Sequence, residues 1–154
     1  MGASVPQSPS SPRLAWSLDT LPVWLVGVLA ALVGAVVAEA FTLVARGAGV
    51  PMAAAGVWEE KAQKIGVGAV AQSVVLWSIG GIVLAVVLAR WAKRPARTFV
   101  VACVGFTLLS LAGPGLAQDT AVSTQLVLGA THLLAAAVIV PILARRLAAR
   151  DAAR

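Results

Sequence analysis

Tyrosine is absent from this chain of 154 residues, and cysteine and histidine occur once each. The single cysteine, Cys103, can form neither an internal disulfide nor a C-x-x-C metal site. Charged residues make up only 12% of the chain, whereas an ordinary soluble domain has about a quarter. With 60% hydrophobic residues, the composition excludes an ordinary soluble domain and indicates an integral membrane protein.

Long apolar runs take the place of the missing polar residues. A hydrocarbon core of about 30 Å needs roughly 20 predominantly apolar residues in a helix. Four segments are long enough, at about 22–45, 65–89, 98–117 and 124–144. The run VVLWSIGGIVLAVVLA at 74–89 lacks the polar face of a soluble amphipathic helix. The sequence therefore predicts an all-α, integral membrane four-helix bundle over residues 21–145, multi-pass in the cell membrane.

The distribution of basic residues predicts the orientation of these spans. Nine of the twelve Lys and Arg fall on one side of the predicted membrane and three on the other. Cytoplasmic loops carry the excess of positive charge, so both the N and C termini are expected to be cytoplasmic. The Ser- and Pro-rich residues 1–20 are expected to form a disordered tail, and 146–154 a basic tail. Because the basic residues flank apolar segments, membrane lipid is an expected partner and nucleic acid is not.

One alternative concerns the first span. The motif AEA at 38–40 fits the A-x-A pattern that precedes cleavage of a signal peptide. However, the apolar run from Leu21 to Ala38 is longer than the usual h-region of about 7–15 residues, and only one cation precedes it. These features favour an uncleaved membrane span, and cleavage stays open as an alternative.

Each span carries polar side chains in its outer half. At a rise of 1.5 Å per residue, Glu39 lies about 9 Å and Gln72 about 8 Å outside the midplane, and Ser110 and His132 each about 4 Å. A charged side chain in hydrocarbon costs about 3 kcal/mol on insertion scales, so polar groups at one depth are expected to bond one another. The sequence predicts an outer polar pocket that binds a ligand through Glu39, Gln72, Ser73, Trp77, Thr107, Ser110, Gln125 and His132.

Helical spacing predicts that two of these residues face inward. Small residues precede Glu39 at intervals of four, and small residues flank His132 at intervals of three and four, which permits close helix packing. Trp77 is expected to fill the core. The connection at about 46–66 is long enough to form a lid over the outer end, and Pro114 is expected to open the third helix near its outer end.

The pocket has a functional and a structural interpretation. Intramembrane acids are usually functional, and Glu39 and His132 could share a proton as a catalytic pair. A hydrogen bond that only joins two helices would explain the same residues. Thr107 and Ser110 can each bond a carbonyl of their own helix, which requires no ligand. One histidine and one acid are too few for a metal site, so neither a metal nor another cofactor is expected.

Two motifs carry a resemblance to a known family. They are LLSLAGPGLA at 108–117 and LGATHLLAAAVIVPILARRL at 128–147, and they resemble a family of small uncharacterised four-helix membrane proteins of high-GC Gram-positive bacteria (actinobacteria). The resemblance implies a four-helix membrane fold and such a host, and it implies no activity. The matching positions are Ser110, Leu111, Gly113, Pro114, His132, Leu133 and Pro141.

Three functions are compatible with these features. The first is binding of a small lipophilic or amphiphilic molecule in the outer pocket. The second is an intramembrane acid–base enzyme, an isomerase, cyclase or hydrolase, that uses Glu39 and His132 on a lipophilic substrate. The third is a subunit of a proton-coupled transporter, which would be a homo-oligomer because four helices are few. The sequence favours binding or catalysis over transport because only one broken helix is visible.

Overall fold

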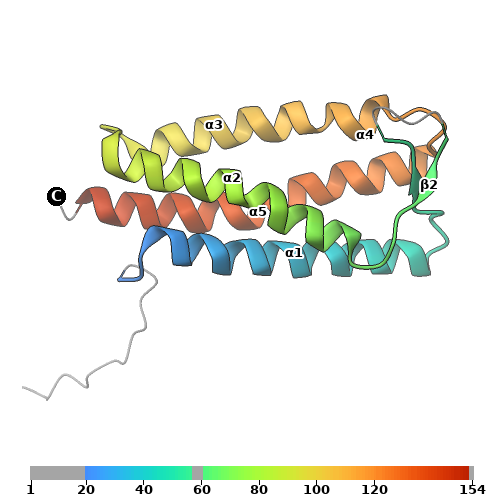
Figure 1. Cartoon of the computed structure of the whole chain (residues 1–154), viewed down its shortest axis with the longest axis horizontal. Coiled ribbons are helices and arrows are strands. Elements are labelled where there is room, and N and C mark those ends of the chain that lie inside the picture. The colour runs from blue at the N-terminus through green and yellow to red at the C-terminus, as the bar shows by residue number, and fades with distance from the viewer. Residues whose placement is uncertain (1–19, 57–60, 153–154) are drawn as a thin grey trace, which may run out of the picture.

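The computed structural model describes residues 20–56 and 61–152. The disordered tail expected at 1–20 therefore lies outside the described residues, apart from Thr20. The helices lie side by side in a bundle, and two short strands lie at one end of it (Figure 1). In chain order the elements are α1 (Val23–Gly47), β1 (Ala53–Ala54), β2 (Gln63–Lys64), α2 (Ala69–Trp91), α3 (Pro95–Ser110), α4 (Ala112–Leu116) and α5 (Val122–Ala152).

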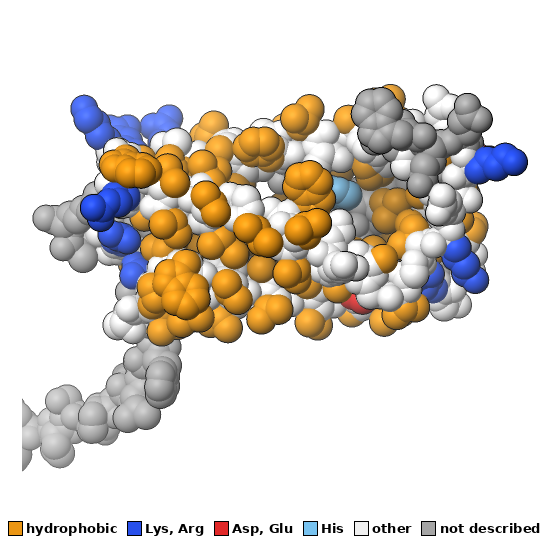
Figure 2. Space-filling view, viewed as in Figure 1, with side chains coloured by type: hydrophobic (Ala, Val, Ile, Leu, Met, Phe, Trp, Pro, Cys, Tyr) orange, Lys and Arg blue, Asp and Glu red, His pale blue; other side chains and the backbone are white. Residues whose placement is uncertain are grey.

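Four helical segments are long and apolar enough to cross a membrane, as the sequence predicts. They have 25, 23, 22 and 31 residues, with α3 and α4 together forming the third. Figure 2 shows hydrophobic side chains over the middle of the bundle and Lys and Arg at its two ends. Large apolar side chains such as Phe106 are exposed on this middle belt. Such a surface suits contact with lipid better than contact with water.

The first helix is the most buried of the four long helical segments. The buried residues of α1 recur along one side of the helix and include Gly27, Ala31, Gly34 and Ala35. A Cβ atom placed on Gly27 would lie 2.7 Å from Ile82 of α2, and one on Gly34 would lie 2.9 Å from Ile139 of α5. Small residues thus let α1 approach two helices closely. This confirms that small residues on the side of α1 that carries Glu39 face inward.

The apolar core lies toward the basic end of the bundle. It combines residues from all four long helices: Val23, Val26, Ala85, Ala89, Phe99, Leu143 and Leu147. At the same end the Nε of Arg146 donates a 2.7 Å hydrogen bond to the carbonyl of Leu21, which ties the start of α1 to α5. The buried residues of α3 are confined to its first five residues, at Pro95 and Phe99. The second half of α3 is therefore much less buried than its beginning.

The prolines explain where the helices end and where one continues. Pro95 is the first residue of α3, where its missing N–H costs nothing. The third span is interrupted at Leu111, between α3 and α4, because Pro114 has no N–H to donate to the carbonyl of Ser110. Pro141 lies inside α5, and the helix continues to Ala152. The basic tail expected from residue 146 is therefore helical through Ala152, since Ala, Leu and Arg are strong helix formers.

Candidate functional site

Glu39 is half-buried on α1 and binds the beginning of α2. Its Oε1 accepts a 2.8 Å hydrogen bond from the backbone N–H of Gly68, and its Oε2 accepts one of 3.0 Å from that of Ala71. Gly68 is the N-cap residue of α2 and has no side chain with which to cap it. The carboxylate of a different helix thus satisfies two backbone donors that α2 cannot satisfy itself. The partial positive charge at the helix N-terminus stabilises this anion.

Arg46 lies two turns after Glu39 on the same helix and binds the same segment. Its Nη2 donates hydrogen bonds of 2.6 Å to the carbonyl of Ile65 and 3.2 Å to that of Gly66. Thr42 is fully buried between the two charged residues, and its hydroxyl donates to the carbonyl of Glu39 at 2.8 Å. Sequence analysis did not identify Arg46 as a partner of this region. Its spacing of seven residues from Glu39, which puts both on one helix side, could have indicated it.

Side chains of the α4–α5 connection hold the described parts of the α1–α2 connection. The Ala55 amide donates to the hydroxyl of Thr120, and the Ala62 amide donates to Oδ2 of Asp119, each at 3.0 Å. Strands β1 and β2 pair as a short antiparallel hairpin. Met52, just before β1, is fully buried. The hairpin lies at the end of the bundle where α4 ends and α5 begins (Figure 1), which is the position expected for a lid.

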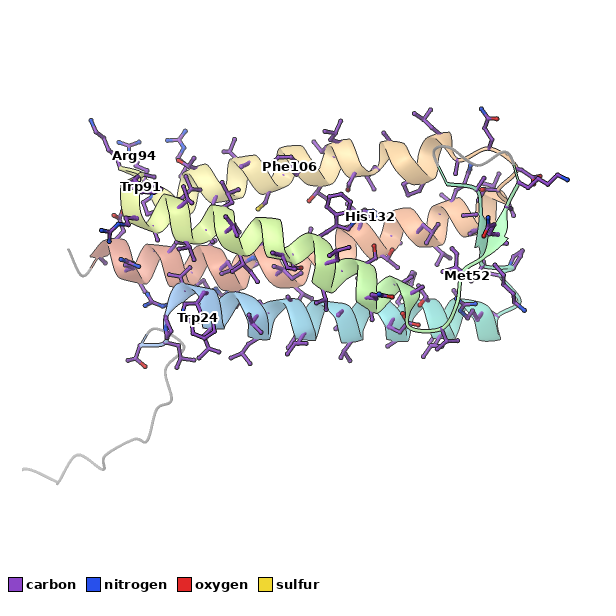
Figure 3. All side chains as sticks on the ribbon, viewed as in Figure 1. Trp24, Met52, Trp91, Arg94, Phe106 and His132 are labelled. Atoms are coloured by element: carbon purple, nitrogen blue, oxygen red, sulfur yellow. The ribbon has the colours of Figure 1, made fainter. Side chains whose placement is uncertain are left out.

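His132 is half-buried on α5 and projects into the space between α2 and α3 (Figure 3). Its Nδ1 lies 2.7 Å from the carbonyl oxygen of Leu128. A carbonyl can only accept, so Nδ1 carries the proton and Nε2 of the neutral ring is an acceptor. Among the described residues, no side chain or backbone group bonds Nε2. The Nε2 of the imidazole is therefore available to a ligand in this space.

A hollow adjoins the imidazole. Figure 2 shows the pale blue ring of the only histidine at the surface, at the edge of a hollow in the half of the bundle that carries the two strands. The burial pattern explains the hollow, because α2 has no buried residue between Val70 and Ala85. On α3, Thr107 and Ser110 are partly buried on the side that faces the bundle. We call the region between α2 and α3 beside His132 the His132 hollow.

The hydroxyl groups of α3 bond within their own helix, as their structural interpretation predicts. Thr107 donates to the carbonyl of Cys103 at 2.8 Å, and Ser110 donates to that of Thr107 at 2.7 Å. Their oxygens can still accept a hydrogen bond from a ligand. The Nε2 of Gln125 donates a 2.9 Å hydrogen bond to the carbonyl of Ala117. Gln125 thus fixes the turn that precedes α5.

Three predicted pocket residues lie on the outside of α2. Gln72 and Ser73 are exposed, and Trp77 is 80% exposed. The expectation that Trp77 fills the core is wrong, because its side of α2 faces away from the other helices. No hydrogen bond or ion pair joins Glu39 to His132, and the carboxylate is bonded to α2 instead. Placement in the same half of the bundle thus did not bring the predicted catalytic pair into contact.

Two fully buried side-chain atoms in the described part of the chain have no hydrogen-bond partner, and the sequence indicated neither. Thr124 is fully buried on α5, and its hydroxyl makes no hydrogen bond; the Nε of Arg46 is also buried and unbonded. Within the described ranges, no three His, Cys, Asp or Glu side chains gather as they would around a metal ion. The candidate site is therefore the imidazole of His132 with the hydroxyl oxygens on the neighbouring face of α3.

The fold and this site define a class of protein: a helical bundle with four candidate transmembrane segments and one histidine beside a hollow in the half of the bundle that carries the two strands. Residues 19–149 match the model of a family of unknown function, DUF6069. The chain belongs to this family, in agreement with the resemblance to uncharacterised proteins. The comparisons with curated proteins and with solved structures found no match.

Proposed function

We propose that this chain is a multi-pass protein of the cell membrane, with both termini cytoplasmic, that binds an amphiphilic molecule at His132 in the outer half of the bundle. The apolar belt in Figure 2 and the four long helices support insertion in the membrane. The basic residues at the end of the bundle that carries the C terminus support the orientation. The host expected from the family resemblance is a high-GC Gram-positive bacterium.

The unbonded Nε2 of His132 carries the proposal for ligand binding. An acceptor without a partner costs about 1–3 kcal/mol where water cannot reach it, and the hydrocarbon around α2 and α3 would contain no water to satisfy Nε2. A ligand that donates a hydrogen bond to Nε2 would remove this cost. The ligand class is therefore a lipid-like molecule with a hydroxyl or amine donor close to an apolar chain. Such a molecule would enter sideways from the bilayer, between α2 and α3.

The contacts of Glu39 favour binding over acid–base catalysis by the predicted pair. Both carboxylate oxygens accept from the backbone of α2, and Glu39 would have to leave these donors in order to exchange a proton with a substrate. The same contacts give Glu39 a reason to be in the membrane that needs no ligand. We therefore assign Glu39 to the support of α2 and His132 to the ligand.

Photocrosslinking tests the site with a defined pair of probes. One probe is a monoacylglycerol with a diazirine in its acyl chain, and the other is the same molecule with both hydroxyls methylated. In phosphatidylcholine nanodiscs, we expect the hydroxyl probe to label the protein about 5- to 10-fold more than the methylated probe. This ratio corresponds to the free energy of one hydrogen bond. His132→Phe should remove this preference, and Ser73→Ala, on the outside of α2, should keep it. Equal labelling of the wild type by both probes would refute the site.

Cysteine labelling tests insertion and orientation independently of the ligand. In a Cys103→Ser background, Lys64→Cys places a thiol on β2 and Arg150→Cys places one near the end of α5. A membrane-impermeant maleimide should label Lys64→Cys on intact cells and should label Arg150→Cys only after permeabilisation. Labelling of Arg150→Cys alone on intact cells would show the opposite orientation. Labelling of both variants on intact cells would exclude the proposal that they lie on opposite sides of the membrane.

A further inference from the structure

A second groove lies at the basic end of the bundle, far from His132. It runs between α3 and α5 and is open on one side. Apart from two arginine side chains, small and branched apolar residues line it. These include Val100 and Val101 on α3 and Ala144 and Ala148 on α5, and the two arginines are Arg97 and Arg145. We call it the α3–α5 groove.

Both arginines of the groove are available to bind an anion. Arg97 and Arg145 are exposed, and no hydrogen bond or ion pair joins either of them to another described residue. Arg146, the neighbour of Arg145, differs because it is bonded to the carbonyl of Leu21. Two unpaired cations in one groove repel each other unless an anion lies between them.

The beginning of α3 adds to the positive potential of the groove. Arg97 lies in the first turn of this helix, which has no acidic residue and no side-chain cap. The N-terminus of a helix carries a partial positive charge that favours anions. This contribution supports the two guanidinium groups and does not define the site alone.

We propose that the α3–α5 groove binds one anionic glycerophospholipid of the cytoplasmic leaflet. Its phosphate lies between Arg97 and Arg145, and an acyl chain runs over Val100 and Val101 toward the bilayer centre. The small side chains of Ala144 and Ala148 leave room for that chain. Basic pockets between transmembrane helices on the cytoplasmic side bind acidic lipid head groups in this way. The proposal rests on the membrane insertion and orientation proposed above, and it is independent of His132.

Native mass spectrometry of the detergent-solubilised full chain, titrated with dioleoyl phosphatidylglycerol or dioleoyl phosphatidylcholine, tests the proposal. We expect tighter binding of phosphatidylglycerol. The double variant Arg97→Gln/Arg145→Gln should weaken it about 30-fold, or about 5-fold for each arginine. The matched control Arg90→Gln/Lys93→Gln removes two exposed cations at the same end of the bundle. These cations lie outside the groove, and their removal should leave the affinity within about 2-fold.

Two further measurements separate a lipid site from a simple charge effect. Ala148→Trp keeps every charge and fills the groove, so it should weaken phosphatidylglycerol binding even if the arginine variant does not fold. Soluble glycerol phosphate in excess should not displace the lipid, because it cannot use the apolar floor. Any one of four results would overturn the proposal. They are equal loss of affinity in both double variants, equal affinity for the two lipids, full affinity in Ala148→Trp, and displacement of the lipid by glycerol phosphate. Such a failure would leave the cysteine-labelling and His132 results unaffected.

Discussion

Glu39 and Arg46 lie on one side of α1, two turns apart, and hold the same stretch of backbone through opposite groups. Glu39 accepts from two amides at the start of α2, whereas Arg46 donates to two carbonyls just before it. The segment 65–71 is therefore fixed at both ends by side chains of α1. We infer that this pair sets the position at which α2 begins, because a helix start in an apolar setting needs partners for its free donors.

Replacement of Glu39 tests this structural role. Glu39→Ala should lower the free energy of unfolding by about 2 kcal/mol, since two amides of α2 lose their acceptors. Glu39→Gln keeps one acceptor oxygen and should lose about half as much. Thermal unfolding of the detergent-solubilised protein measures both effects, with Asp151→Ala, an exposed acid on α5, as the control. Unchanged stability together with lost labelling by the hydroxyl probe would instead give Glu39 the ligand-binding role.

Gly27 tests the close approach of α1 and α2. A methyl group at this position would lie 2.7 Å from Cγ1 of Ile82, and the branched Ile82 side chain is stiff. Gly27→Ala should therefore destabilise the bundle by about 1–3 kcal/mol.

Gly105 of α3 has no atom within 4 Å of the added methyl group, so Gly105→Ala should be neutral or stabilise by about 0.5–1 kcal/mol. Thermal unfolding of the detergent-solubilised protein compares Gly105→Ala with Gly27→Ala. Adding Ile82→Ala to Gly27→Ala should recover part of the loss if contact is the cause, and a purely additive double variant would contradict it.

Adjacent arginines on α5 should differ in their effect on stability. Arg146→Gln loses the hydrogen bond to the Leu21 carbonyl and should cost about 2 kcal/mol, the usual value for a charged donor. Arg145→Gln removes an exposed side chain and should change stability by less than about 0.5 kcal/mol. Unfolding in detergent provides the comparison, and similar losses in both variants would show that Arg146 is not a specific tie to α1.

The hydroxyl of Thr120 should control the opening of the α1–α2 connection. Thr120→Val keeps the shape of the side chain and removes the acceptor of the Ala55 amide. Loss of one hydrogen bond of about 1 kcal/mol should speed exchange of that amide about 5-fold. Hydrogen exchange followed by mass spectrometry measures this on a peptide spanning Ala55. Thr98→Val, whose hydroxyl bonds only its own helix, is the control and should leave Ala55 unchanged.

The positions of the polar groups show how far sequence reasoning reaches. The self-bonding of Thr107 and Ser110 could be predicted because it depends only on the carbonyls three and four residues earlier in the same helix. The partner of Glu39 could not, because the amides of Gly68 and Ala71 are about thirty residues away. The exposure of Trp77 was also missed, since an apolar helix has no polar side to show which way it faces.

The sequence by itself determined the four long apolar helices, their breaks at Pro95 and Pro114 and the charge difference between the two ends. These features depend on length, local composition and proline geometry, which are all read along the chain. The tertiary structure decided that Glu39 caps α2, that His132 faces a hollow and that Arg97 and Arg145 share a groove. Depth in a bundle follows from residue number alone, whereas contact also depends on the rotation and tilt of each helix. Rotation and tilt are set by packing between segments distant in the sequence, such as Gly27 against Ile82.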